Sequence, residues 1–149
     1  MLKIKLIILS VFFISSLTFA SDGMISIKSK HSVKKTSKRL VKALNEKGMT
    51  VFDTIDHKKG AKKVGKKLRP TTLVIFGNPK IGTPLMHCSQ SIALDLPQKA
   101  LIWKDKSGQV WYTYNDPQYL AKRHNINGCD KVLTKVSKAL ANFANKATN

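Results

Sequence analysis

One stretch of the chain, from Arg69 to Pro117, alternates dense apolar runs with turn-forming residues. The runs Leu73–Phe76 and Ala100–Trp103 are rich in the β-branched and aromatic side chains that are typical of strands. A Gly-Asn-Pro turn ends the first run, and an Asp-Lys-Ser-Gly turn after the second predicts a hairpin. This pattern constrains the chain to a fold built on several mainly antiparallel strands.

Helical periodicity lies on both sides of these strands. After an N-cap at Ser32, apolar residues recur at helical spacing until Gly48 ends the helix. The last helix follows Gly128, and its apolar stripe extends to Phe143. Further strands are expected at 24–28 and 50–55, short helices near 61–64 and 117–124, and a short helix or an irregular segment at 81–88. The order predicts an α+β fold of two layers, with helices packed on one face of a mainly antiparallel sheet.

The N-terminal segment has the organisation of a secretory signal peptide. A basic start precedes an apolar run of 14 residues, Leu6–Phe19, which is shorter than the roughly 20 residues that a membrane anchor needs. Small residues before the expected site predict cleavage after Ala20. We therefore expect residues 1–20 to be removed, residues 21–149 to form a single domain, and the mature protein to be periplasmic or secreted.

The chain is strongly basic, with a net charge of +19. Between Lys28 and Arg69 there are 13 lysines and only three acidic residues. Two interpretations stay open: a solvated face that keeps the protein soluble, or a surface that attracts anionic partners such as lipid headgroups. Nucleic acid is a disfavoured partner, because base and phosphate recognition favour arginine over lysine and an exported protein rarely meets DNA.

Cys88 and Cys129 are the two cysteines of the chain. In an exported protein, two thiols most simply form a disulfide. A copper or zinc site is the alternative, because His87 beside Cys88 offers the nitrogen and sulfur ligands that these metals prefer. Folding would have to add His57 or His124 to that site. A nucleophilic Cys88 with a histidine base is a third interpretation, which the oxidising compartment and the second thiol disfavour.

Two segments carry polar side chains that are suited to ligand binding. Asp56-His57 follows a strand, and an imidazole beside a carboxylate serves as an acid, a base or a ligand, or simply as a polar cap. In the turn-rich segment 78–84, glycines permit close approach of a ligand, and Asn78 and Thr83 supply hydrogen-bonding groups; turn geometry alone is the alternative. We expect a small-ligand pocket between the two segments.

The expected hairpin is rich in aromatic residues, namely Trp103, Trp111, Tyr112 and Tyr114. Because side chains alternate along a strand, one set is expected in the core and the other on the surface. An exposed aromatic set is typical of a dimer face, and a stacking surface is the alternative.

Several short motifs resemble the domain-of-unknown-function 302 family. In chain order they are Val51–His57, Leu68–Thr71, Phe76–Pro79, Gly82–Met86, Asp95–Pro97 and Tyr114–Pro117. The resemblance implies a fold similar to a single copy of the TATA-binding-protein-like arrangement, and a tendency to form homodimers. It implies no activity, since a fold serves many functions. Some members share cysteines that match Cys88 and Cys129, which favours the disulfide, whereas many have Gln in place of His87.

The sequence therefore predicts an exported, non-catalytic binding or scaffold protein that forms a homodimer and has a small-ligand pocket. The first alternative is a periplasmic metal or redox protein that uses copper or zinc at His57, His87 and Cys88. The second is electrostatic binding to anionic envelope surfaces through the Lys-rich face. An enzyme is the least favoured class, because the sequence places no acid–base pair within reach of a nucleophile.

Overall fold

The computed structural model describes residues 18–21 and 23–149. Its centre is a six-stranded sheet in the order β1-β2-β6-β5-β4-β3, in which each neighbouring pair is antiparallel. The strands are β1 (Thr18–Ser21), β2 (Met24–Ser29), β3 (Thr50–Asp56), β4 (Thr71–Gly77), β5 (Gln98–Lys104) and β6 (Val110–Asn115). The α+β class and the antiparallel sheet are as predicted from the sequence.

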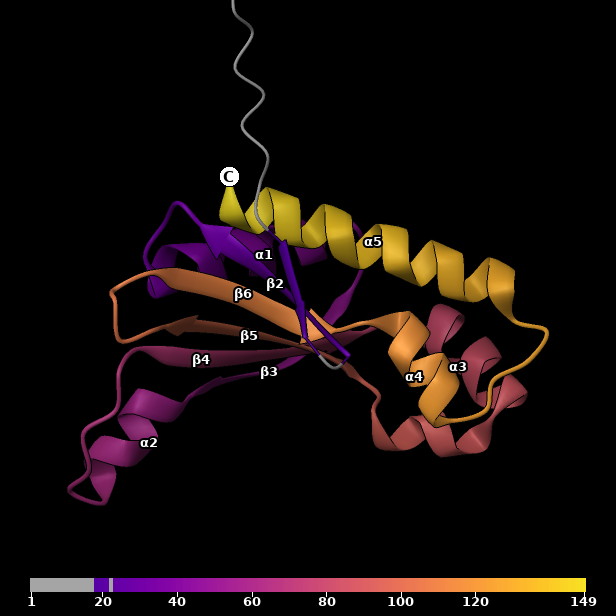
Figure 1. The fold of residues 1–149 in the computed structure, drawn as a ribbon, viewed down its shortest axis with the longest axis horizontal. Helices are drawn as coiled ribbons and strands as arrows, with labels where there is room; N and C mark the ends of the chain where they lie inside the picture. The colour runs from indigo at the N-terminus through magenta and orange to yellow at the C-terminus, as the bar shows by residue number, and fades with distance from the viewer. Residues whose placement is uncertain (1–17, 22) are drawn as a thin grey trace, which may run out of the picture.

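Two long helices, α1 (Val33–Glu46) and α5 (Asp130–Thr148), pack against each other and against one face of the sheet (Figure 1). The Ser32 side chain caps α1 by accepting a hydrogen bond from the Lys35 backbone N–H at 3.3 Å. Gly48, at φ 64°, then turns the chain into β3 with a backbone conformation that favours glycine. These local signals explain why sequence periodicity located α1 well.

Alternation along the strands decides which side chains meet the two helices. Val74 and Phe76 of β4, Ile102 of β5 and Tyr112 of β6 are fully buried in this layer. Phe76 meets Phe143 of α5 edge to face, with ring centroids 6.1 Å apart. The core therefore lies between one sheet face and the helix pair.

The opposite face of the sheet, which we call the open face, carries the other half of the strand side chains. Its central residues are Leu73, Ile75, Leu101, Trp103 and Trp111, and all are half-buried. Trp103 and Trp111 are paired directly across β5 and β6, as are Leu73 and Leu101 across β4 and β5. The helices α1 and α5 lie on the other side of the sheet, so they do not cover this apolar face.

Three of the shorter helices gather at one end of the sheet, below the N-terminal half of α5 (Figure 1). They are α3 (Pro79–Cys88), the 3-10 helix η1 (Gln90–Leu94) and α4 (Pro117–Arg123). A disulfide joins Cys88 at the end of α3 to Cys129 just before α5, with Cα atoms 6.5 Å apart. The predicted cysteine pair is thus present, and it ties α3 to the helix layer.

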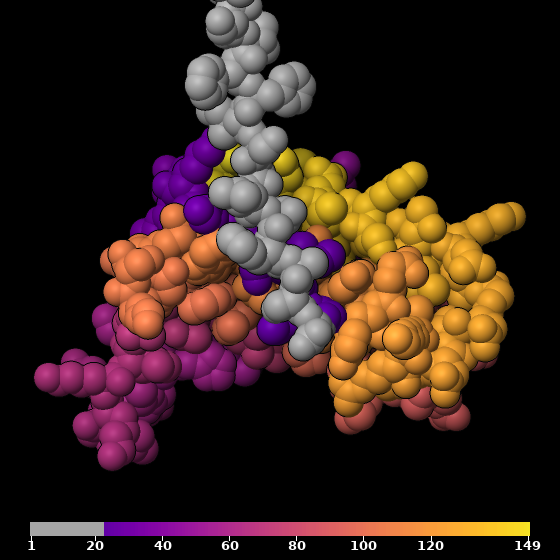
Figure 2. Space-filling view, viewed as in Figure 1, coloured from indigo at the N-terminus to yellow at the C-terminus, as the bar shows by residue number. Residues whose placement is uncertain are grey.

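At the opposite end, α2 (His57–Lys63) and the loop after it project from the body of the molecule (Figure 2). From 56 to 69, every side chain is exposed except Ala61, which is half-buried. The helix begins earlier than the expected 61–64, because the Asp56 carboxylate caps it by accepting from the Lys59 N–H at 2.9 Å. The sequence also gave no indication of β1 or η1.

The expected signal peptide lies mainly outside the described residues, which omit 1–17. Its last three residues, 18–20, belong to β1, which pairs with β2 at the edge of the sheet. Within the described part of the chain, no helix combines the length and apolar character that crossing a membrane requires.

Candidate functional site

A cavity of about 540 Å³ opens where the sheet, α3 and α5 meet. The volume lies within the range of small-molecule sites. Most of its wall is apolar, and the residues that contribute are Met49, Phe52, Phe76, Pro79, Ile81, Leu85, Met86, Ala93, Leu96, Pro97, Val136, Ala139, Leu140 and Phe143. We call this the end cavity, and it is the main candidate site of the protein.

The Gly77-Asn78-Pro79 turn builds one wall of the end cavity. The Asn78 Oδ1 atom caps α3 by accepting from the Lys80 N–H at 2.9 Å, while its Nδ2 donates to the Gly48 carbonyl at 3.3 Å. One side chain therefore fixes the start of α3 against the turn between α1 and β3. A Cβ atom on Gly77 would approach the Phe52 ring to 3.3 Å, so glycine leaves room for this wall residue.

Six polar residues line the cavity, namely Lys47, Asn78, Thr83, Gln98, Lys135 and Asn142. Lys47, at the C-terminal end of α1, and Lys135, on α5, have exposed side chains and line the cavity. Gln98, the first residue of β5, also lines it and is 9% exposed. The lining contains no Asp or Glu, so the site is a mainly apolar space with a basic border.

The predicted ligand residues separate into two groups. Asn78 and Thr83 line the end cavity, whereas Asp56 and His57 lie at the other end of β3. Thr50 pairs with Gly77 in β4 while Asp56 pairs with Thr72, so the strand separates them by about 20 Å. The expectation of one pocket between the two segments is therefore wrong. Both segments follow strands in the sequence, but neighbouring antiparallel strands end at opposite edges of the sheet.

The expected metal ligands also do not assemble. Cys88 is bonded to Cys129, which removes the thiolate that a metal would need. His57 is exposed at the start of α2 and His87 is exposed on α3, at opposite ends of the sheet. Among the residues that the structure describes, no group of three His, Cys, Asp or Glu side chains is placed to hold a metal ion.

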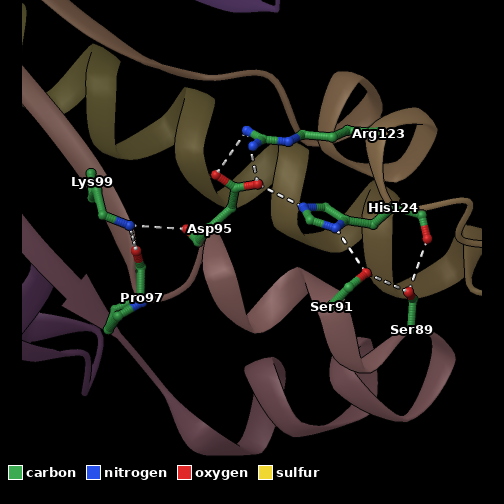
Figure 3. Close-up of polar contacts among 7 residues, drawn as sticks. All are labelled: Ser89, Ser91, Asp95, Pro97, Lys99, Arg123 and His124. Atoms are coloured by element: carbon green, nitrogen blue, oxygen red, sulfur yellow. Dashed lines mark hydrogen bonds and ion pairs between the residues drawn. The ribbon is translucent and has the colours of Figure 1, made fainter.

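A polar cluster that the sequence did not reveal joins η1 to α4 (Figure 3). One Asp95 carboxylate oxygen lies 2.6 Å from Nε2 of His124, and Ser91 Oγ lies 2.9 Å from its Nδ1. Arg123 adds an ion pair to Asp95 at 3.3 Å. Ser89 donates to the His124 carbonyl at 2.9 Å. Its members come from two segments about 30 residues apart, so no local motif could signal it.

This cluster contains a serine, a histidine and an aspartate but lacks the arrangement of a hydrolase triad. In such triads the serine bonds Nε2 and the aspartate bonds Nδ1 of the histidine, whereas here Ser91 and Asp95 bond the opposite nitrogens. His124 is buried and is the residue at which α4 ends. The cluster is therefore a structural connection that fixes the η1 segment, which carries cavity residues Ala93 and Leu96.

The aromatic hairpin divides as alternation predicts. Tyr112 and Tyr114 are buried under the helices, and burial raises the pKa of both hydroxyls above the ordinary value. Trp103 and Trp111 lie on the open face, half-buried. Trp103 Nε1 donates to Thr113 Oγ1 at 3.0 Å and Trp111 Nε1 to Asp105 Oδ2 at 2.8 Å, so both rings are held in fixed positions.

Comparison with known proteins gives the family. Residues 25–143 match the family described as "Domain of unknown function DUF302", and the chain belongs to it. A solved structure, described as an uncharacterised conserved DUF302 protein from Bacillus stearothermophilus, superposes with a TM-score of 0.76 at 16% identity. The match covers 85% of this chain and 99% of that one. At this identity, the match to the solved structure shows the fold alone.

Curated relatives carry a different kind of name. Proteins called "Fluoride-specific ion channel FluC 1" in Brucella suis and "Fluoride-specific ion channel FluC 2" in Brucella melitensis are each 47% identical over 114 residues, 76% of this chain. The match covers 45% and 42% of those proteins, respectively. This chain thus spans less than half the length of the curated relatives that it matches.

Proposed function

We propose that this protein is an exported, non-catalytic binding protein that takes a small, largely apolar ligand into the end cavity. The observation that carries the proposal is the cavity of about 540 Å³ lined mainly by apolar side chains. Burying apolar ligand surface there is favourable by about 25 cal/mol per Å² removed from water. The absence of Asp and Glu from the lining favours binding over catalysis.

The walls of the end cavity are restrained in ways that favour a preformed site. The Cys88–Cys129 disulfide fixes the end of α3, Asn78 fixes its start, and the His124 cluster fixes the η1 segment. A site that is ordered before binding loses less conformational entropy when the ligand arrives.

Filling the cavity with a larger side chain tests the proposal. Ala139 lines the cavity from α5, while Ala141 on the same helix is exposed and does not line it. A neutral naphthylamine dye should bind the wild type and Ala141→Trp equally, whereas Ala139→Trp should lower its affinity at least tenfold. Equal binding to all three proteins would mean that the dye, and with it the proposed site, is not in the cavity.

Export is part of the proposal, on the basis of the N-terminal segment. Cleavage after Ala20 would also remove most of β1, which pairs with β2, and leave β2 as the edge strand. N-terminal sequencing of protein from cell envelopes tests this: the chain should begin at Ser21. A protein recovered from the cytosol with Met1 at its N-terminus contradicts export.

We also propose that the protein forms a homodimer through the open face. Aromatic and apolar residues at the centre of a surface are typical of protein interfaces, and the paired Trp103 and Trp111 with Leu101 provide such a centre. Leu101→Glu should shift sedimentation velocity from dimer to monomer. Ala141→Glu, on an exposed position of α5, should leave the dimer intact, and a monomeric wild type at all concentrations contradicts the proposal.

A second candidate function is attachment to an anionic membrane surface through α2 and its loop. Residues 57–69 carry six lysines and Arg69, with no acidic residue, and each lysine near an anionic lipid surface contributes about 1 kcal/mol of attraction. Val64 and Leu68 are exposed on the same segment, at 71% and 43%. The Brucella relatives that contain a similar sequence are named ion channels, and that name favours this candidate.

Vesicle sedimentation tests the second candidate. Replacing Lys58, Lys59, Lys62 and Lys63 with Gln should abolish binding to vesicles that contain anionic lipid. The matched control replaces four exposed lysines elsewhere, at 122, 131, 138 and 146, and should weaken binding much less. If the two sets weaken binding equally, the attraction belongs to net charge and not to this segment.

A further inference from the structure

We propose that the ligand of the end cavity is an amphipathic anion: a small molecule with an aliphatic body and one negatively charged group, such as an alkyl carboxylate. This inference rests on the proposed function and adds the charge and polarity of the ligand. Two independent features of the cavity carry it, namely its cationic border and one unpaired amide in its wall.

The border of the cavity is positively charged. Lys47 and Lys135 both line it with exposed side chains, and neither forms an ion pair with another described residue. The whole chain carries +19, so an anion is attracted to the mouth of the cavity. The lining contains no carboxylate that would repel it.

The wall contains a polar group that lacks a partner. Gln98 is 91% buried, since 9% of it is exposed, and it pairs with Phe76 across the strands, so its side chain lies on the helix-covered face of the sheet. It lines the cavity, and its amide makes no hydrogen bond to another described residue. Only His31, Tyr112 and Ser137 have buried side-chain atoms without a partner among the described residues, so the Gln98 amide stays accessible and can hydrogen-bond a ligand that carries an oxygen atom, which a pure hydrocarbon cannot do.

The remainder of the wall suits an alkyl chain. Met49, the residue before β3, and Met86 of α3 both line the cavity. Unbranched, flexible methionine side chains adapt to chains of different shape. Affinity should therefore rise by about fourfold for each methylene added to the ligand, until the cavity is filled.

Isothermal titration calorimetry with decanoate, hexanoate and 1-decanol tests the ligand class. The wild type should bind decanoate about fivefold or more tightly than 1-decanol, and hexanoate most weakly. Lys47→Met with Lys135→Met should remove the preference for decanoate. The control pair Lys38→Met and Lys138→Met has the same net charge, lies on α1 and α5 and does not line the cavity, so it should keep that preference.

The outcomes separate this inference from the proposed function. Equal affinity of the wild type for decanoate and 1-decanol, both blocked by Ala139→Trp, would overturn the anionic ligand and leave the apolar site standing. Failure of every probe to bind would overturn the proposed function itself. If the control variant loses the preference for decanoate as the cavity variant does, overall charge selects anions and the two lysines of the border do not.

The unpaired amide has its own test. Gln98→Met keeps the length of the side chain and removes its hydrogen-bonding atoms, so the fold should be as stable as the wild type. Decanoate and 1-decanol should both bind several-fold more weakly, while the hydrocarbon-like naphthylamine dye should bind as well or better. Unchanged affinities for the two oxygen-bearing probes would exclude Gln98 from ligand recognition.

Discussion

A single carboxylate, Asp105, organises the turn between β5 and β6. It accepts hydrogen bonds from the Ser107 hydroxyl at 2.7 Å, from the Trp111 indole at 2.8 Å, and from the backbone N–H groups of Ser107 and Gln109. The Ser107 side chain first, and the Trp111 indole next, hold the pKa of Asp105 at about 2, below its ordinary 3.8. The ionised form is therefore the one that the fold stabilises.

This pKa predicts a dependence on acid. A lowered pKa stabilises the fold fully above the ordinary value of 3.8, and this contribution is lost as the pH falls towards 2. Asp105→Asn should therefore lower the urea midpoint at pH 7, and the gap to the wild type should narrow between pH 4 and pH 2. A gap that is constant over this range would show that the charge of Asp105 is irrelevant to the turn.

Tyr112 predicts the opposite dependence, in alkali. Its hydroxyl is buried with no hydrogen-bond partner among the described residues, and burial, with a smaller effect from Tyr114, raises its pKa above the ordinary 10.0. Above pH 10 the unfolded chain loses this proton and the folded chain keeps it, so stability should fall as the pH rises.

Replacing the tyrosine tests this directly. Tyr112→Phe should be as stable as the wild type at pH 7, or more stable by up to about 1 kcal/mol, because it removes an unpaired polar group. Between pH 9 and 11, its denaturation midpoint should fall less than that of the wild type. A loss of stability at pH 7 would mean that the hydroxyl has a partner, such as a buried water.

Residue by residue, the sequence predicted only part of the candidate site. The turn-rich segment predicts Asn78 and Thr83 as ligand residues, and both line the end cavity. Asp56 and His57 have side chains suited to ligand binding, but they lie at the far end of β3. No sequence motif marks Gln98 or Lys135 as a site residue, because they line the end cavity only when β5 and α5 pack together.

At the scale of elements, the disulfide between α3 and α5 is expected to stabilise the fold. The bond spans 41 residues, for which the chain-entropy account gives about 3–4 kcal/mol. Cys88→Ser with Cys129→Ser should therefore lower the melting temperature by roughly 10 °C and weaken binding in the end cavity. Wild-type protein treated with reductant should behave like the double variant; an unchanged melting temperature in both would contradict this role.

The connection between η1 and α4 gives a second prediction at this scale. His124→Ala removes two side-chain hydrogen bonds and leaves Asp95, whose side chain is 13% exposed, with only Arg123. We expect a loss of about 1–3 kcal/mol in unfolding free energy. His87→Ala, an exposed histidine on the adjacent α3, is the control and should cost little. Equal stability of the two variants would mean that the cluster does not hold η1 in place.

The elements themselves were largely predictable, for reasons that are local. Strands β4, β5 and β6 have the β-branched and aromatic composition of a sheet, and α1 and α5 have apolar stripes with caps or glycines at their ends. The misses have physical causes as well. The start of α2 depends on the Asp56 cap, and η1 depends on contacts with α4 that arise only in the folded chain.

At the scale of the whole molecule, three surfaces have different characters. The helix-covered side contains the end cavity, the open face is apolar and aromatic, and α2 with its loop is cationic and projects from the body (Figure 2). Because the three surfaces are separate, the proposed ligand, the proposed second copy and the proposed anionic surface would not compete for the same residues. Sequence patterns predicted the charge and the aromatic alternation, but the cavity results from tertiary packing and was found only in the structure.

Methyl-resolved NMR during titration with decanoate tests the central claim most directly, because it reports on each wall of the molecule separately. If the end cavity is the binding site, the methyl signals of Ile81, Leu85, Leu96 and Leu140 shift with one common affinity, while those of Leu73, Ile75 and Leu101 on the open face do not move. Shifts confined to the open face, or none at all below the concentration at which decanoate forms micelles, would contradict the account.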